Sequence, residues 1–186
     1  SVAELLKSSF EIIDLFATKQ WIVKNNYAKA NEVSVAELAR ISNLKSANNV
    51  LAVVNIPAEK KERSEGVILV LDDVNDPGNL GTIIRMCDWF GVEQIVCSKN
   101  TVDFYNPKVV QSTMGSLFRV SLLYTDLNKY LAKTTTPIYG AFMDGENIKS
   151  SNAKENIHLV MGNEANGISK ELQKYISKKG SIAING

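Results

Sequence analysis

The chain has 186 residues, of which 45% are hydrophobic and 22% are charged, and its formal net charge is +1. This composition is typical of a globular protein of one or two domains, and no apolar run reaches the roughly 18 to 20 residues of a membrane-spanning helix. Because the net charge is near zero, any nucleic acid would have to be held by local basic patches rather than by the field of the whole protein.

Residues 1–56 alternate short helical and extended segments, which predicts a small α/β domain. A Ser-x-x-Glu pattern at Ser34 and Glu37 is typical of a capping box and predicts the start of a helix there. The expected helices begin near residue 2, cover 19–25 and follow Ser34, and the expected strands cover 12–16 and 50–56.

A polar turn and a charged segment follow this domain's helices. Lys45 and Asn48 lie in the turn before the last strand, where they could contact RNA phosphates or bases, although a solvated turn explains them as well. Residues 57–65 read PAEKKERSE and have no apolar side chain after Ala58, which predicts an interdomain linker. We therefore expect a second domain over residues 66–186.

The second domain opens with a strand, a polar loop and a helix. Residues 67–71 form a short apolar run, which is typical of a strand buried on both faces of a parallel sheet. Residues 72–79 combine Asp, Asn, Pro and Gly, which predicts a loop that can present backbone N–H groups to a ligand. Apolar residues then recur at helical spacing, at Leu80, Ile83, Ile84, Cys87 and Phe90. We expect the first four of them to face the core.

The loop does not match the common nucleotide-binding motifs. Its GNLG run lacks the third glycine and the later acidic residue of the dinucleotide fingerprint, and it lacks the Gly-Lys-Ser/Thr ending of a phosphate loop. An NAD(P)-dependent oxidoreductase on a doubly wound sheet is an alternative function, but the missing dinucleotide fingerprint opposes it.

The rest of the second domain alternates apolar and helical segments, which predicts a parallel sheet covered on both faces. Ligands of such sheets bind beyond the carboxyl ends of the strands, where the loops at Asn75, Met143 and Asn163 are expected. Further strands are expected over 94–97, 117–123, 137–142 and 157–161, with helices beginning near Pro107 and around 127–131.

The loop after the strand at 157–161 reads GNEANGIS and places Glu164 between Gly162 and Gly167. Glycine permits positive φ and close backbone approach, so an adenosine-like ligand could lie against the main chain. A hairpin-like turn with one solvated glutamate is the alternative.

The cysteines and the histidine of this chain do not indicate a metal site or a catalytic site. Cys87 and Cys97 lack the spacing of metal ligands, which predicts buried reduced thiols. His158, the one histidine, lies in an apolar run and is expected to be a core residue rather than a catalyst. We therefore expect neither a metal site nor a serine triad. No targeting segment is visible, which predicts a cytoplasmic protein.

Three stretches carry a family resemblance: DPGNLGTIIR at 76–85, YNPKVVQSTMGSLFRV at 105–120 and LVMGNEANGIS at 159–169. They resemble the SpoU, or TrmH-like, branch of the SPOUT RNA methyltransferases. The resemblance implies transfer of a methyl group from S-adenosylmethionine to a ribose 2′-hydroxyl of ribosomal or transfer RNA. It also implies a trefoil-knotted α/β domain that works as a homodimer, and a first domain that binds the RNA substrate.

The resemblance assigns roles to residues of this chain. Asn79, Arg85 and Glu164 match the family's functional Asn, Arg and Glu, and Arg85 is also expected to contact RNA. Further RNA-binding candidates are Lys45, Asn48 and Ser112. The expected cofactor-binding residues are Ala141, Phe142, Met143, Gly162, Asn163, Ile182 and Ile184.

One part of the family pattern is not met. The third family motif, a Pro-containing strand exit followed by Ser-Leu-Asn and a helix, is expected near Ile184, whereas the sequence stops at Gly186. An earlier strand is likewise expected before the first helix. We therefore expect an incomplete domain at both ends, and a non-catalytic RNA-binding relative of the fold is the second alternative.

Overall fold

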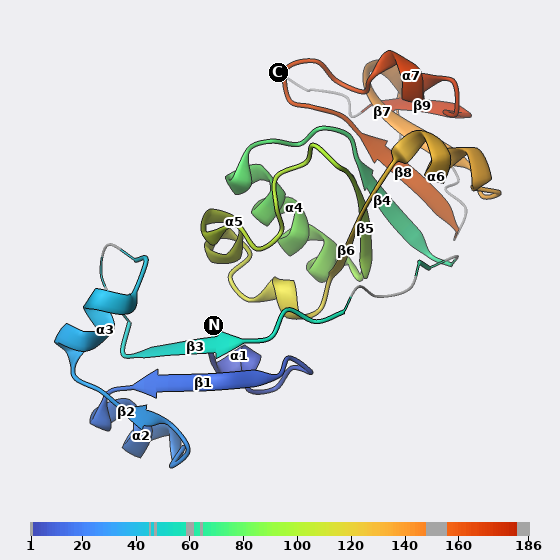
Figure 1. Cartoon of the computed structure of the whole chain (residues 1–186). Helices are drawn as coiled ribbons and strands as arrows, with labels where there is room; N and C mark the ends of the chain where they lie inside the picture. The colour runs from blue at the N-terminus through green and yellow to red at the C-terminus, as the bar shows by residue number, and fades with distance from the viewer. Residues whose placement is uncertain are drawn as a thin grey trace. The chain divides into compact units, whose positions relative to one another are not determined.

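The computed structural model describes residues 2–44, 46, 48–58, 62–63, 65–147 and 156–181. Within it the chain forms two compact units, Ser1–Ala58 and Glu59–Gly186, which are considered separately (Figure 1). Three of the candidate site residues, Lys45, Ile182 and Ile184, lie outside the described residues.

The first unit is a three-stranded sheet of order β2-β1-β3 with three short helices. The predicted capping box is confirmed: Ser34 Oγ accepts a hydrogen bond from the Glu37 N–H at 3.2 Å, and Glu37 Oε2 accepts one from the Ser34 N–H at 2.8 Å. Strand β1 pairs in parallel with β2, which sequence analysis did not predict, and antiparallel with β3. The elements are α1 (Val2–Leu5), β1 (Ile12–Ala17), α2 (Lys19–Asn25), β2 (Asn31–Glu32), α3 (Val35–Ile41) and β3 (Val50–Val54).

The second unit confirms the predicted parallel α/β sheet. Its six strands have the order β6-β5-β4-β8-β7-β9, and every pairing between neighbours is parallel. The trefoil knot stays a prediction. The elements are β4 (Val67–Leu71), α4 (Pro77–Phe90), β5 (Gln94–Ser98), α5 (Pro107–Ser112), the 3-10 helix η1 (Ser116–Phe118), β6 (Ser121–Thr125), α6 (Leu127–Lys133), β7 (Ile138–Asn147), β8 (Ile157–Met161), α7 (Lys170–Gln173) and β9 (Lys178–Ser181).

Helices cover both faces of this sheet, as Figure 1 shows, with α4 and α5 on one side and α6 and α7 on the other. On the α6 and α7 side, Ile68 and Val70 of β4 belong to a core that includes Leu131 and Leu172. Strand β4 is therefore packed on both faces, which explains why residues 68–71 are all apolar. This arrangement places β4 and β8 at the centre of the sheet.

The structure differs from the expectations in two places. Leu117, expected in a strand, lies in η1, and β6 begins only at Ser121 because Gly115 turns the chain with a φ of 104°. Strand β9 was not predicted, because its sequence KKGS has no apolar residue and it lies at the sheet edge. Phe90, the last residue of α4, is 73% exposed.

Candidate active site

The start of α4 places Asn79 at the carboxyl end of β4. Asp76 caps the helix, and its Oδ1 accepts a hydrogen bond from the Asn79 N–H at 2.7 Å. Pro77 follows at the first helical position, where the ring supplies the required φ and a missing N–H costs nothing. The polar loop thus holds Asn79 in the first turn, with its side chain exposed.

Asn79 and Glu164 are brought together from opposite ends of the domain sequence. The Asn79 Nδ2 group donates a hydrogen bond to Glu164 Oε1 at 2.8 Å. The contact forms because β4 and β8 are parallel neighbours in which Leu71 lies opposite Met161, so the loops that follow them meet at one edge. A bond to a carboxylate is stronger than one between neutral groups, so this pair orients both side chains.

Asn163 organises the loop that carries Glu164. Its Nδ2 group donates to the Asp73 carbonyl at 2.8 Å, and its Oδ1 accepts from the N–H groups of Ala165 and Asn166 at 3.0 and 3.1 Å. Backbone bonds in both directions also join Asn163 to Gly167. Both the side chain and the backbone of Asn163 are therefore engaged in hydrogen bonds within the protein, which fixes the shape of the loop.

Asp72 ties the same two loops together, and sequence analysis did not identify it. This carboxylate is buried, and its Oδ2 accepts a hydrogen bond from the Ser169 N–H at 2.8 Å. Asp73, next along the chain, has a φ of 61°, and its N–H donates a hydrogen bond to Ser98 Oγ at 2.9 Å. The available signal was the position of both aspartates immediately after a buried strand.

Gly162 permits a close approach within the loop itself. A Cβ atom at Gly162 would lie 2.0 Å from the carbonyl carbon of Gly167, which no side chain could tolerate without backbone movement. Gly167 has a φ of 66°, in the region that favours glycine. Both glycines therefore set the narrow shape of the loop.

The candidate cofactor residues of β7 lie where its pairing with β9 is interrupted. Gly180 lies opposite both Ala141 and Glu146, so residues 142–145 form a bulge outside the ladder. Met143 in this bulge is 99% exposed, and the Lys179 ammonium lies 4.7 Å from the centre of the Phe142 ring. The bulge offers backbone groups and an exposed apolar side chain at the edge next to β8.

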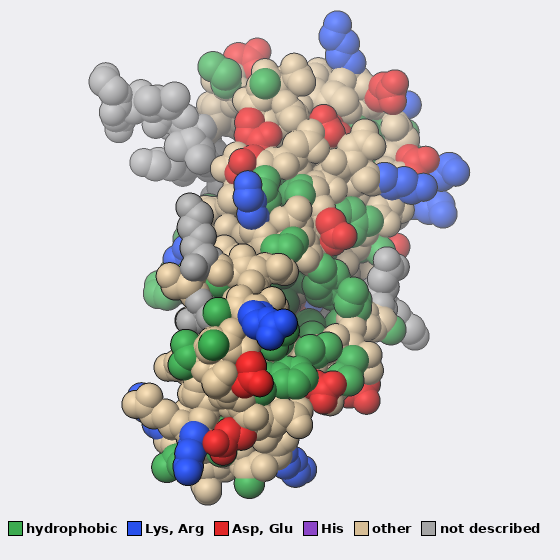
Figure 2. All heavy atoms as spheres, turned by 60° about the vertical axis from the view of Figure 1, so that its left-hand side comes forward, with side chains coloured by type: hydrophobic (Ala, Val, Ile, Leu, Met, Phe, Trp, Pro, Cys, Tyr) green, Lys and Arg blue, Asp and Glu red, His purple; other side chains and the backbone are tan. Residues whose placement is uncertain are grey.

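Arg85, six residues after Asn79 on α4, takes no part in the hydrogen bond between Asn79 and Glu164. It is exposed on α4, where it lines an open hollow of about 350 Å³ together with Thr82, Met86 and Trp89. Trp89 is 86% exposed, and Figure 2 shows exposed hydrophobic side chains among charged ones on one face of the molecule. Arg85 is therefore a surface residue of α4 and not a core residue.

The RNA-binding candidate Ser112 lies against α4 at Gly81, two residues after Asn79. Ser112 Oγ donates to the Lys108 carbonyl at 2.7 Å, and Ser112 packs against Gly81, where a Cβ atom would lie 2.3 Å from that of Ser112. Asn48 is exposed and belongs to the first unit. Their RNA-binding roles stay predictions.

The SpoU rRNA methylase family matches residues 66–186, the region that contains all of these loops. The chain belongs to this family. RlmP of Bacillus subtilis, a 23S rRNA guanosine 2′-O-methyltransferase, is 32% identical over 136 residues, which cover 71% of this chain and 54% of RlmP. A 23S rRNA uridine 2′-O-methyltransferase of Streptomyces viridochromogenes is 37% identical over 73 residues, covering 37% of this chain and 25% of that protein.

Solved structures of SpoU relatives have the same fold. A protein assigned to the TrmH family of RNA methyltransferases from Porphyromonas gingivalis has a TM-score of 0.88 and 33% identity over 100% of this chain and 78% of that one. AviRb of Streptomyces viridochromogenes, solved with AdoMet, has a TM-score of 0.80 at 21% identity with the same coverage. The chain spans about half of the length of RlmP and less of the other curated relatives.

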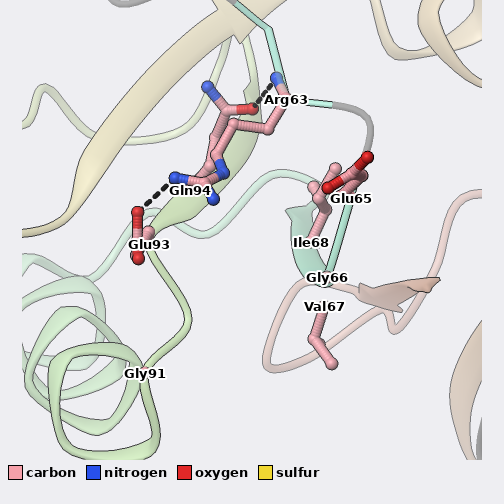
Figure 3. A pocket seen from close by; sticks show the side chains of 8 residues that line it. All are labelled: Arg63, Glu65, Gly66, Val67, Ile68, Gly91, Glu93 and Gln94. Atoms are coloured by element: carbon pink, nitrogen blue, oxygen red, sulfur yellow. Dashed lines mark hydrogen bonds and ion pairs between the residues drawn. The ribbon is translucent and has the colours of Figure 1, made fainter. Parts of the chain in front are cut away.

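At the amino ends of the strands, the opposite edge of the sheet, polar groups form hydrogen bonds and an ion pair with one another. Figure 3 shows a small pocket of about 50 Å³ there, where the Arg63 N–H donates to Gln94 Oε1 at 2.7 Å and the Arg63 guanidinium pairs with Glu93. His158, 5% exposed, contacts the Tyr130 hydroxyl through Nε2 at 2.8 Å and the Thr136 hydroxyl through Nδ1 at 2.7 Å. The prediction of a core histidine is confirmed.

The buried histidine and the two buried cysteines have the properties of structural residues. Burial lowers the pKa of His158, and burial raises the pKa of Cys87 to about 12. Both cysteines are free and buried, as predicted. Within the described residues no group of three His, Cys, Asp or Glu side chains could hold a metal, and no helix of this part of the chain is long and apolar enough to cross a membrane.

Proposed function

We propose that this chain carries the catalytic domain of an RNA methyltransferase that transfers a methyl group from S-adenosylmethionine to a ribose 2′-hydroxyl. Ribosomal RNA is the favoured substrate because RlmP and its Streptomyces relative act on 23S rRNA. Transfer RNA is the alternative substrate, and the cytoplasm is the proposed location. The observation that carries the proposal is the bond between Asn79 and Glu164, which joins two separate family motifs at one sheet edge.

The reaction demands positioning more than unusual chemistry. Bound S-adenosylmethionine supplies the electrophilic methyl group. The protein must align the ribose oxygen for in-line attack and accept or disperse the charge that develops when its proton leaves. His158 cannot take that proton, because it is buried and both ring nitrogens are engaged by hydroxyl groups.

The Asn79–Glu164 pair is suited to holding the ribose. Glu164 Oε1 accepts from Asn79, which leaves Asn79 Oδ1 as an acceptor and the second carboxylate oxygen of Glu164 for sugar hydroxyls. Both side chains are exposed to an incoming ligand. We assign the pair to orienting the reacting nucleotide.

The cofactor would be held by main-chain groups of the two neighbouring loops. The fit rests on the bulge at residues 142–145, whose backbone has no partner residue in the register of β7 with β8 or β9. Ala141, Phe142 and Met143 would contact the cofactor from this side, and Gly162 and Asn163 from the other. A narrow glycine loop beside a backbone bulge suits a flat adenine ring.

Arg85 would act at the active site of a homodimer. It is exposed on the same helix as Asn79 but lines the hollow beside Met86 and Trp89. An exposed apolar helix face of this kind is typical of a subunit interface. We therefore propose that α4 packs against a second copy, and that Arg85 holds the RNA phosphate next to the reacting ribose, since guanidinium binds phosphate through two parallel bonds.

Methyl transfer to unmodified 23S rRNA tests the proposed function. Radiolabelled S-adenosylmethionine should label the transcript at one ribose, and nuclease digestion should yield a 2′-O-methylated nucleotide. RNA binding without any transfer to ribosomal or transfer RNA would favour the non-catalytic alternative. The first unit is proposed to bind the same RNA, and its removal should raise KM for RNA.

Light scattering tests the dimer. The wild type should have twice the mass of the 20.5 kDa chain, and Trp89→Ser with Phe90→Ser should shift it toward the monomer. Val23→Ser is the matched control, since Val23 of the first unit is also 73% exposed but lies outside α4. A wild-type monomer that methylates RNA would contradict the shared site.

A further inference from the structure

The positive charge of the second unit is concentrated in one segment that no family motif includes. Residues 170–179 contain four lysines and one glutamate, a net charge of +3, whereas the whole chain has a formal charge of +1. The rest of the chain is therefore slightly acidic, at −2. RNA attraction must come from a local patch, and this is the strongest run of positive charge among the described residues.

This segment is continuous with the candidate active site. Helix α7 begins at Lys170, directly after the loop that carries Glu164, and the chain returns as β9 beside β7. Within that pairing Lys179 lies opposite Gly140, two residues before Phe142. The lysines thus lead away from the active-site edge along the outer side of the sheet.

Aromatic rings lie beneath two of these lysines. The Lys174 ammonium lies 4.9 Å from the centre of the Tyr175 ring, and the Lys179 ammonium lies 4.7 Å from that of Phe142. Both rings are partly buried against the core. Lysines alternating with aromatic faces are typical of surfaces that bind single-stranded nucleic acid, because bases stack where phosphates are neutralised.

The site edge itself repels phosphate. Its described loops carry the carboxylates of Asp72, Asp73, Asp76, Asp103 and Glu164. By contrast, Arg63, Arg119 and Lys129 form ion pairs, whereas Lys170, Lys174 and Lys179 form none with the described residues. An RNA strand that enters an acidic edge needs unpaired cations nearby to compensate, and these three lysines are available.

We propose that the face formed by α7 and β9, the lysine face, binds the phosphate backbone of RNA beside the nucleotide that is methylated. The face is defined by Lys170, Lys174 and Lys179. This inference rests on the proposed function, because it takes RNA as the substrate of the adjacent site. It makes these lysines positioning residues that act on RNA affinity and not on the methyl-transfer step.

Filter binding of an unmodified 23S rRNA transcript tests the lysine face. The double variant Lys174→Gln with Lys179→Gln should bind on the order of tenfold more weakly at 0.1 M salt, and its log–log salt slope should fall by about 1.4 for two lost single-strand phosphate contacts. Replacing the same two lysines with arginine should restore both values. In single turnover, the Gln variant should show a raised half-saturating RNA concentration and a wild-type rate at saturation.

The matched control is Lys129→Gln with Lys133→Gln, which removes two exposed charges of α6, a helix that carries no candidate site residue. This control should bind RNA within about twofold of wild type. Equal weakening by both double variants, or wild-type affinity of Lys174→Gln with Lys179→Gln, would overturn the lysine face. Weakening seen only with intact ribosomal particles would indicate an acidic protein partner and would also overturn it. RNA binding that weakens as predicted without methyl transfer would overturn the proposed function alone.

Discussion

The two edges of the parallel sheet carry similar polar side chains, which are exposed at the carboxyl edge and buried at the amino edge. At the carboxyl edge, Asn79 and Glu164 bond to each other but stay exposed. At the amino edge, Gln94 is 1% exposed, and His158 is closed in by the Tyr130 and Thr136 hydroxyls. Burial with every partner inside the protein marks a structural group, whereas an ordered but open pair can still accept a ligand.

The largest expected effect is that of Arg85→Ala. This variant tests whether the active site includes Arg85, which takes no part in the hydrogen bond between Asn79 and Glu164. Loss of a charge-assisted contact to phosphate or to the developing charge should reduce single-turnover methylation roughly 10²- to 10³-fold, or about 2 to 4 kcal/mol. Arg85→Lys should fail too, because an ammonium lacks the two-pronged geometry. Cofactor affinity and melting temperature should hardly change, since Arg85 is exposed.

Arg119→Ala is the control for this prediction. Arg119 makes two bonds of 2.7 Å to Asp88, and those bonds lower the pKa of the Asp88 carboxyl. Its loss should affect stability slightly and methylation within about threefold. If Arg85→Ala keeps more than about a third of the wild-type rate, Arg85 is an ordinary exposed helix residue.

Buried polar groups at the amino edge should matter for stability and not for catalysis. His158→Ala should reduce the free energy of unfolding by about 2 to 3 kcal/mol, because it leaves a cavity and removes the partner of two hydroxyl groups. Tyr130→Phe removes one of these bonds and should cost about 1 kcal/mol. Urea unfolding measures both. A His158→Ala protein that keeps wild-type stability but has lost methyl transfer would contradict the structural role of His158.

Glycine substitutions compare the two edges directly. Gly162→Ala forces a Cβ atom against Gly167 and should displace the loop, at about 1 to 3 kcal/mol of stability and with weaker S-adenosylmethionine binding by calorimetry. Gly66→Ala at the amino edge has no heavy atom within 4 Å of the new Cβ, and its φ of 81° is strained for alanine. This control should lose about 1 kcal/mol of stability and bind the cofactor normally. Normal cofactor binding by Gly162→Ala would remove that loop from the site.

The smallest effect concerns pH. Burial lowers the pKa of His158, so on acidification the unfolded chain takes up a proton before the native protein does. The free energy of unfolding should therefore be fully retained above about pH 6.5 and should decrease as pH falls below it. His158 is the one histidine of the chain, so this dependence should vanish in His158→Asn. Identical urea midpoints of the wild type at pH 7.5 and 5.5 would contradict it.

Much of the second unit follows from local patterns. The apolar run of β4, the capping residue Asp76 and the helical spacing of Leu80, Ile84 and Cys87 predict a buried strand, a polar loop and a helix. The parallel-sheet rule then predicts that the loops after β4, β7 and β8 meet. Helical spacing alone does not reveal that Phe90, the last residue of α4, is 73% exposed.

The contacts that complete the site have no local signal. The bonds from Asn79 to Glu164 and from Asn163 to Asp73 join residues 85 and 90 positions apart, and only the tertiary arrangement brings them together. Family resemblance pointed to Asn79 and Glu164, but nothing in the pattern identified Asp72 as the group that joins the two loops. Strand β9 was missed because KKGS at a sheet edge needs no apolar face.

A double-mutant cycle on Asn79 and Glu164 tests most directly whether the carboxyl edge is the site of methyl transfer. Single-turnover methylation of unmodified 23S rRNA would be measured for wild type, Asn79→Ala, Glu164→Gln and the double variant. Each single change should lower the rate about 10- to 100-fold, and the double variant should be no slower than the worse single one, because the two groups act as a unit. Rates within threefold of wild type for both single variants would contradict the assignment of this edge as the active site.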